Sequence, residues 1–170
     1  MNKIIRREKT TILIGAEGDD DYALCQHLKT IYCSRDLNIN IDIFNTHGGS
    51  PRQTVHKTKQ RKDARQFHYA YAITDSDRDD LQAAIDYAVK ESIELIMLEP
   101  VCLEGMLLNS LGEKAPLTAP KCKSRLRMQC GDGIFKQATL AQHFPENKLD
   151  KMRLKVPALN QLIEVFTIKA

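Results

Sequence analysis

The sequence has 170 residues, a formal net charge of +3, and 42% hydrophobic and 28% charged residues. A chain of this length forms one domain with a core and is too short for two comfortable ones. No apolar run approaches the roughly 18 residues that a membrane-spanning helix needs, and the run TILIGA is too short for a secretion signal. We therefore expect a cytoplasmic protein, whose five irregularly spaced cysteines are reduced and form no structural zinc site.

The first part of the chain alternates predicted strands and helices. Residues 10–18 are a short apolar run that stops at a glycine, as a buried parallel strand does. Residues 19–32 predict a helix with acidic residues in its first turn, and residues 38–44 alternate strictly, which predicts an edge strand. Residues 52–65 predict a helix with Ser50 as its cap and Pro51 in its first turn, but with almost no buried face.

The alternation continues through residues 67–112. We expect a strand over 67–74, a helix over 75–92 that Asp77 caps and whose core stripe includes Val89, a strand over 93–100, and a helix over 102–112. Four repeats of strand and helix predict an α/β fold of Rossmann-like type, with a mainly parallel four-stranded sheet flanked by helices. We therefore assign residues 1–112 to an α/β core.

The last third of the chain has a different pattern. Residues 114–133 are basic, lack a clear period and are punctuated by proline and glycine, which predicts a loop. Residues 134–144 and 157–170 predict closing helices. Residues 113–170 are thus expected to form a basic loop and a C-terminal helical extension packed on the same domain.

Acidic side chains follow three of the four predicted strands. Because ligands collect at the carboxyl ends of parallel strands, these carboxylates are expected to share one cleft. Clustered carboxylates repel one another unless a cation is present, and their oxygens suit Mg²⁺ or Mn²⁺. The predicted metal ligands are Glu17, Asp75, Asp77, Asp79 and Glu104. A plainer interpretation stays open, since acidic residues after a strand also favour the first turn of a helix.

Two basic segments predict contact with a polyanion. The first is the poorly amphipathic helix 52–65, and the second lies in the predicted basic loop. The residues expected to bind nucleic acid are Arg52, Lys57, Lys59, Arg61, Lys62, Arg65, Lys121, Lys123, Arg125 and Arg127. A solvated basic surface without a ligand is the alternative.

Three stretches together resemble a known family. ILIGAEGDDD, AITDSDRD and EPVCLEGMLLNSL, taken in this order, resemble the glutamate motif, the DxD motif and the following helix of a Toprim domain. The layout is most similar to the small RloB-like proteins of restriction and phage-defence loci. Here Asp21 stands where those proteins tend to carry a second glutamate, and Leu103 replaces an aromatic residue before Glu104.

The resemblance implies a Mg²⁺-dependent nuclease. Glu17 would act as general acid or base, while Asp75 and Asp77 would hold the metal; all three would be catalytic. The partners would be DNA or RNA, with an ATPase or another defence subunit as a further candidate, and a homo-oligomer stays open. Two alternatives remain: a non-catalytic Toprim-like subunit that binds nucleic acid or an ATPase, and, ranked lower, a phosphoacceptor receiver-like domain.

Overall fold

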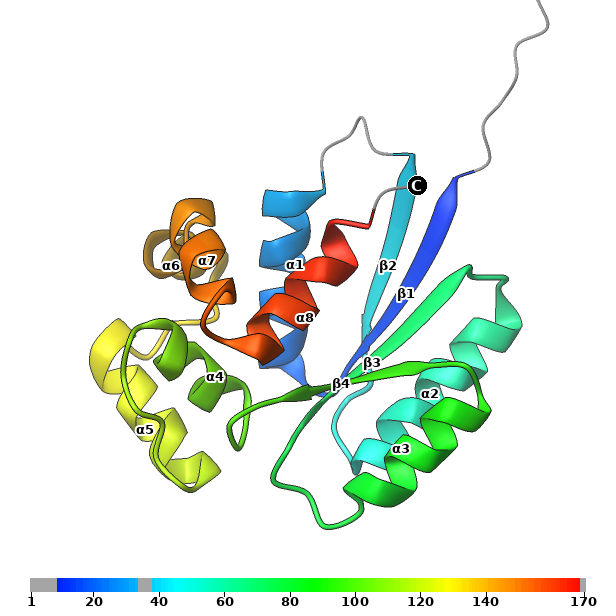
Figure 1. Ribbon diagram of the computed structural model, residues 1–170, viewed down its shortest axis with the longest axis horizontal. Helices are drawn as coiled ribbons and strands as arrows, with labels where there is room; N and C mark the ends of the chain where they lie inside the picture. The colour runs from blue at the N-terminus through cyan, green and yellow to red at the C-terminus, as the bar shows by residue number, and fades with distance from the viewer. Residues whose placement is uncertain (1–8, 34–37, 169–170) are drawn as a thin grey trace, which may run out of the picture.

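Four parallel strands form the centre of the molecule in a computed structural model (Figure 1), which describes residues 9–33 and 38–168. The strands are β1 (Thr10–Ala16), β2 (Ile39–Asn45), β3 (Tyr69–Asp75) and β4 (Glu94–Leu98), in the spatial order β2-β1-β3-β4. All three neighbouring pairs are parallel, so the α/β prediction is confirmed, with an all-parallel sheet where a mainly parallel one was expected.

Eight helices accompany the sheet within the described residues. They are α1 (Asp19–Tyr32), α2 (Pro51–Ala64), α3 (Leu81–Lys90), α4 (Leu103–Ser110), α5 (Ala119–Cys130), α6 (Gln137–His143), α7 (Glu146–Arg153) and α8 (Pro157–Phe166). Residues 1–8 of the predicted α/β core, and residues 169–170 of the predicted last helix, lie outside the described residues.

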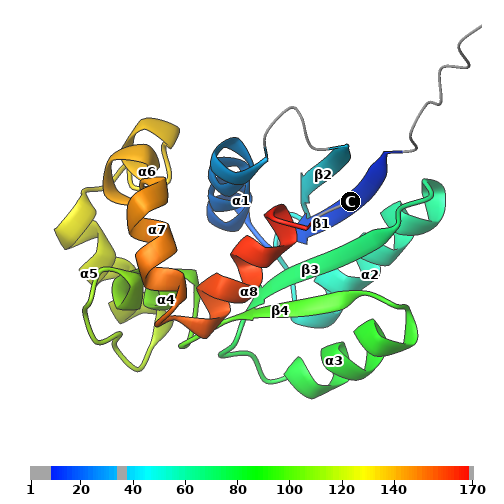
Figure 2. The same cartoon turned by 45° about the horizontal axis from the view of Figure 1, so that its top comes forward.

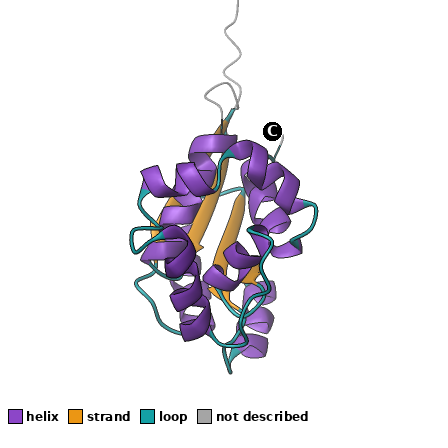
Figure 3. Cartoon of the chain, turned by 90° about the vertical axis from the view of Figure 1, so that its left-hand side faces the viewer, coloured by secondary structure: helices purple, strands orange, loops and turns teal. Residues whose placement is uncertain are grey.

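Alternation along the strands divides the core into two clusters, because successive side chains of a strand point to opposite faces. On one face, Leu13 of β1 packs with residues of β3, α2 and α3, and on the other face Ile12 and Ile14 pack with residues of α1, α4 and α8. Figure 2 shows the sheet between these two helical layers, with α2 and α3 together on one side, and Figure 3 shows the strands in orange among the helices in purple. The second cluster also contains Phe144 and Leu159, so helices from the last third share the core of the first two thirds.

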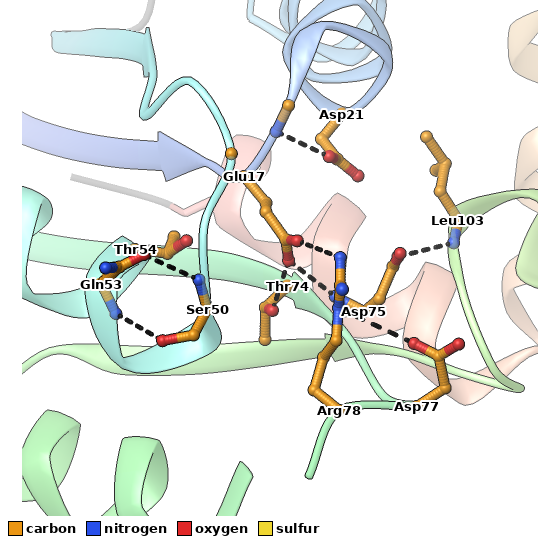
Figure 4. A network of polar contacts seen from close by, with 12 residues as sticks. Glu17, Asp21, Ser50, Gln53, Thr54, Thr74, Asp75, Asp77, Arg78 and Leu103 are labelled. Atoms are coloured by element: carbon orange, nitrogen blue, oxygen red, sulfur yellow. Dashed lines mark hydrogen bonds and ion pairs between the residues drawn. The ribbon is translucent and has the colours of Figure 1, made fainter. Parts of the chain in front are cut away.

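Helix α2 has a buried face, contrary to the expectation that it would have almost none. Its buried residues are Pro51, Thr54, Val55 and Thr58, and the Thr58 hydroxyl is satisfied by the Thr54 carbonyl at 2.8 Å. Two threonines therefore serve as core residues that a hydropathy pattern does not count. As predicted, Ser50 caps the helix, in a capping box with Gln53 (Figure 4).

Three local predictions are wrong. Residues 119–130, expected as loop, form helix α5, and α7 was not expected at all. Helix α3 begins at Leu81 after Asp80, so Asp77 does not cap it. Val89 is 74% exposed, because α3 turns Ala84 and Ala88 toward the sheet.

Neither a membrane span nor a disulfide is found in the described residues. Every helix in residues 9–33 and 38–168 falls short of the length and hydrophobicity that crossing a membrane requires. The five cysteines, all in this part of the chain, are free thiols.

Candidate functional site

The acidic residues predicted to share a cleft converge at the carboxyl ends of β1 and β3. Glu17 directly follows β1, Asp75 is the last residue of β3, and Glu104 stands in the first turn of α4 after β4. Because neighbouring strands run parallel, their ends meet at one edge of the sheet. A cavity of about 300 Å³ is lined there by Glu17, Asp21, Asp75 and Glu104, together with Arg78 and Lys123.

Glu17 is the most constrained of these acids, with only 6% of the residue exposed. Its Oε2 accepts hydrogen bonds from the Thr74 hydroxyl at 2.6 Å and the Asp75 amide at 3.3 Å. Its Oε1 accepts a hydrogen bond from Arg78 at 2.6 Å (Figure 4). A buried carboxylate requires such partners, so the site fixes the Glu17 side chain in one orientation.

Asp75 faces the start of the next helix in the site. Its Oδ1 accepts a hydrogen bond from the Leu103 amide at 3.1 Å, at the N-terminus of α4 (Figure 4). Burial raises the pKa of Asp75 to about 6; the Leu103 amide opposes the rise, and the charges of Glu17 and Glu104 add to it. This carboxylate is therefore poised to change charge near neutral pH.

Asp21 is the acid whose environment least favours a negative charge. It lies in the first turn of α1, where it accepts a hydrogen bond from the Gly18 amide at 2.9 Å. Burial raises the pKa of Asp21 to about 8; Asp75, Glu17 and Glu104 contribute to the rise, and the Gly18 amide opposes it. The cavity thus contains more acidic groups than it can hold ionised without a cation.

Arg78 is a site residue that the sequence analysis missed. Its guanidinium contacts Glu17 at 2.6 Å and Asp77 at 3.8 Å. Although burial acts in the opposite direction, the surrounding carboxylates of Glu17, Asp75 and Asp77 raise the pKa of Arg78. The signal was available in the sequence: Arg78 is the one cation inside the acidic run DSDRDD.

Not every predicted acid reaches the cavity. Asp77 and Asp79 are exposed, neither lines the cavity, and the Asp77 carboxylate lies 3.8 Å from the Arg78 guanidinium. The amides of Ser76 and Asp77 donate to the Val101 carbonyl at 3.2 and 3.1 Å, which ties the loop after β3 to the loop after β4. Asp77 is held at the rim of the site by these contacts.

The acidic cluster offers only oxygen ligands and fits a cation that needs few of them. Within residues 9–33 and 38–168, no three acidic, histidine or cysteine side chains are arranged to hold a metal ion together. Mg²⁺ often takes one or two protein carboxylates and completes its shell with water or phosphate oxygens. Asp75, with Asp21 or Glu104, fits that mode, whereas Asp77 and Asp79 do not join the group.

The two predicted basic segments differ in what their side chains contact. In α2, Arg61 and Arg65 pair with Asp42, at 3.0 and 3.6 Å, and the Lys62 ammonium donates to the carbonyl of Glu91 at 2.8 Å. Lys57 and Lys59 also have protein partners, and the Arg52 guanidinium lies 5.7 Å from the ring centroid of Tyr87. Most of the α2 cations thus serve internal contacts.

Helix α5 carries cations beside the acidic cavity. Lys123 lies 3.8 Å from Glu104, and Arg125 pairs with Glu113 at 2.8 Å. Among the described residues, neither Lys121 nor Arg127 forms an ion pair, and both are exposed. The surface next to the site therefore retains uncompensated positive charge.

Comparison with known proteins gives no relative for this arrangement. No protein-family model, no curated protein and no solved structure matches the chain.

Proposed function

We propose that this chain is a Mg²⁺-dependent nuclease of Toprim type that hydrolyses phosphodiester bonds in nucleic acid. The observation that supports this best is one cavity, at the carboxyl ends of β1 and β3, where Glu17, Asp75 and Glu104 face Arg78 and Lys123. Acids that can hold a cation, beside basic groups that can hold a phosphate, are what phosphoryl chemistry requires.

Mg²⁺ or Mn²⁺ would be held by Asp75 with Asp21 or Glu104 as its nearest companions. When bound, the ion neutralises charge on the scissile phosphate and polarises it toward attack. The raised pKa values of Asp21 and Asp75 support a cation in this place. A positive charge would stabilise the ionised carboxylates and so offset the effects of burial and repulsion on their pKa values.

Arg78 and Glu17 have complementary roles in this proposal. The Glu17 side chain is 8% exposed and that of Arg78 44%, so the guanidinium extends from the buried acid toward solvent. A phosphate entering the cavity competes with Glu17 for Arg78, because guanidinium groups bind phosphate oxygens in a bidentate manner. Glu17 is then free to exchange a proton with the attacking or leaving oxygen.

The direct test is cleavage by the purified chain of plasmid DNA, single-stranded DNA and RNA, each with Mg²⁺, Mn²⁺ or EDTA. We expect metal-dependent cleavage that Glu17→Gln and Asp75→Asn abolish and that Asp86→Asn, an exposed change on α3, leaves intact. Cleavage that persists in EDTA, or in the Glu17→Gln variant, would show that the acids do not carry the reaction.

A non-catalytic role as a nucleic-acid-binding subunit is the second candidate. The observation that favours it is the ion pair of Glu17 with Arg78, which occupies the proposed proton-transfer group. In that case the chain binds nucleic acid, cleaves none of the three substrates with any metal, and retains its affinity in the Glu17→Gln variant.

A further inference from the structure

Four adjoining hollows line the surface from the acidic cavity to the far side of α5. The acidic cavity shares Asp20, Glu104 and Lys123 with a second hollow of about 230 Å³. That hollow shares Lys123, Arg127 and Asp132 with a third of about 510 Å³, which shares Ser124 and Met128 with a fourth of about 690 Å³. The four adjoin in sequence around α5, and we call them the α5 track.

The charge of the α5 track suits a polyanion. Lys121, Lys123 and Arg127 stand along it, and Lys121 and Arg127 have no ion-pair partner in the described ranges. Lys123 lines both the acidic cavity and the adjoining hollow, and Arg127 lines that hollow together with Asp20 and Glu104, so their positive charges lie at the mouth of the acidic cavity. A basic path ending at acidic groups directs a phosphate chain toward them.

The track also exposes apolar groups between its cations. Leu117 is 88% exposed and Met128 78%, and both line the outermost hollow. Phe135 lines the hollow next to the acidic cavity. Large apolar side chains beside basic ones suit unpaired bases, since a duplex stacks its bases inside and presents mainly phosphates and groove edges.

Helix α2 does not offer an equivalent surface. The basic residues of its second half contact Asp42 and the end of α3, and Arg65 lines a separate hollow with Thr11 at the start of β1. Because Glu17 follows the end of β1, this part of α2 lies at the opposite end of the sheet from the acidic cavity. A strand bound there would not reach the site.

We propose that the α5 track binds a single strand of nucleic acid and leads it into the acidic cavity. The inference rests on the proposed function for the cleavage of that strand in the cavity. DNA and RNA share the phosphates and base faces that this surface recognises, so the test includes both.

The test measures binding without cleavage, by fluorescence anisotropy in EDTA with labelled oligothymidylate, oligouridylate and a duplex of about 20 base pairs. Two variants each lower the net charge from +3 to +1: Lys121→Gln with Arg127→Gln on α5, and Lys62→Gln with Arg65→Gln at the end of α2. We expect the α5 pair to weaken single-strand binding about tenfold and to lower the salt dependence by about 1.4 log units per log unit, about 0.7 for each lost phosphate contact. The α2 pair should bind like the unmodified chain.

The outcomes separate this inference from the proposed function. Equal weakening by the two pairs, duplex binding as tight as single-strand binding, or no binding to either oligonucleotide would overturn the α5 track. Tight binding that depends on α5, combined with no cleavage under any metal, would preserve the track and refute the nuclease. If the Lys121→Gln, Arg127→Gln variant keeps both its metal-dependent cleavage and its binding affinity, the nuclease is preserved and the α5 track is refuted. Unchanged oligonucleotide binding, with loss of binding to an acidic peptide, would assign the surface to a protein partner and also refute the track.

Discussion

Replacing Asp21 by asparagine is expected to stabilise the protein by an amount that depends on pH. Asparagine keeps an oxygen that accepts the hydrogen bond from the Gly18 amide, now 2.9 Å long, and removes the negative charge. The substitution therefore isolates the cost of ionising a carboxyl group beside Asp75, Glu17 and Glu104.

The size of the effect follows from the pKa shift of Asp21, from 3.8 to about 8. One pKa unit corresponds to about 1.36 kcal/mol, so a shift of about four units sets an upper limit near 6 kcal/mol. Asp21 as a residue is partly exposed, and its repulsion with Asp75 is a property of the pair, so we expect about half of that limit, roughly 3 kcal/mol.

The sign of the pH dependence is fixed by the direction of the shift. The folded state binds the Asp21 proton more tightly than the unfolded state, so the free energy of unfolding decreases as the pH rises from about 4 through about 8. Below about pH 4 the carboxyl group is protonated in both states. The variant should match the unmodified protein there and exceed it increasingly up to about pH 8.

Urea unfolding in EDTA, at several values between about pH 4 and pH 9, measures this difference. Asp86→Asn makes the same chemical change on the exposed side of α3 and should give a small difference that does not vary with pH. A difference for Asp21→Asn that is independent of pH, or a variant less stable at about pH 8, would contradict the argument from clustered charge.

Three other outcomes are expected. At about pH 8, Mg²⁺ at a hundred times its dissociation constant should stabilise the protein by about 2.7 kcal/mol in thermal unfolding. The Asp75→Asn variant should lose most of this stabilisation. Equal stabilisation of the variant and the unmodified protein would show that the ion binds elsewhere. Gly105→Ala should lower the free energy of unfolding by roughly 1–3 kcal/mol, because the added Cβ would lie 2.2 Å from a backbone carbonyl oxygen. Gly133→Ala is the control and should cost less, because its Cβ meets only a flexible lysine side chain. Equal costs for the two variants would contradict the close approach at Gly105. Arg78→Gln should slow the proposed cleavage reaction about a hundredfold in a single-turnover assay while the chain stays folded, and an unchanged rate would remove Arg78 from the site.

The strands and their end acids were predictable because two independent patterns agree there. A short β-branched run ending in glycine predicts a buried parallel strand, and parallel topology brings Glu17 and Asp75 to the same edge. Glu104 joins them because α4 begins just after β4 and its first turn faces the same edge. The order of the acids also predicted repulsion among these groups, which adds to the burial that raises the pKa of Asp75.

Helix α5 could not be predicted from apolar periodicity in the way that α1 was. Its buried residues are Cys122, Leu126 and Cys130, four residues apart, so only one leucine marks a face otherwise made of thiols. Pro120, which suggested a break, lies in the first turn, where proline is tolerated. The spacing of the two cysteines and the leucine was the available signal for a helix, and it is weak because four basic residues lie next to them.

Which acids line the cavity and which do not depends on loop geometry that no spacing rule supplies. Asp77 belongs to the same DxD pattern as Asp75, yet it ends at the rim because the chain has already turned toward Val101. Asp79 lies still farther along the same loop and is exposed. Residue type and order identified the cluster, but the hydrogen bonds of the backbone decide its members.

The backbone carbonyl of Val101 accepts hydrogen bonds from two amides, and this limits how the loop between β4 and α4 can vary in sequence and in length. An oxygen of the backbone accepts from Ser76 and Asp77, so any side chain compatible with the local backbone could replace that of Val101 without loss of the contact. Adding or deleting a residue between β4 and α4 would instead displace the oxygen and the Leu103 amide that Asp75 uses. Position 101 should therefore be permissive in its side chain while the segment is strict in length, and inserted segments or fused domains are better placed elsewhere, such as at the exposed turn of Leu154 and Lys155.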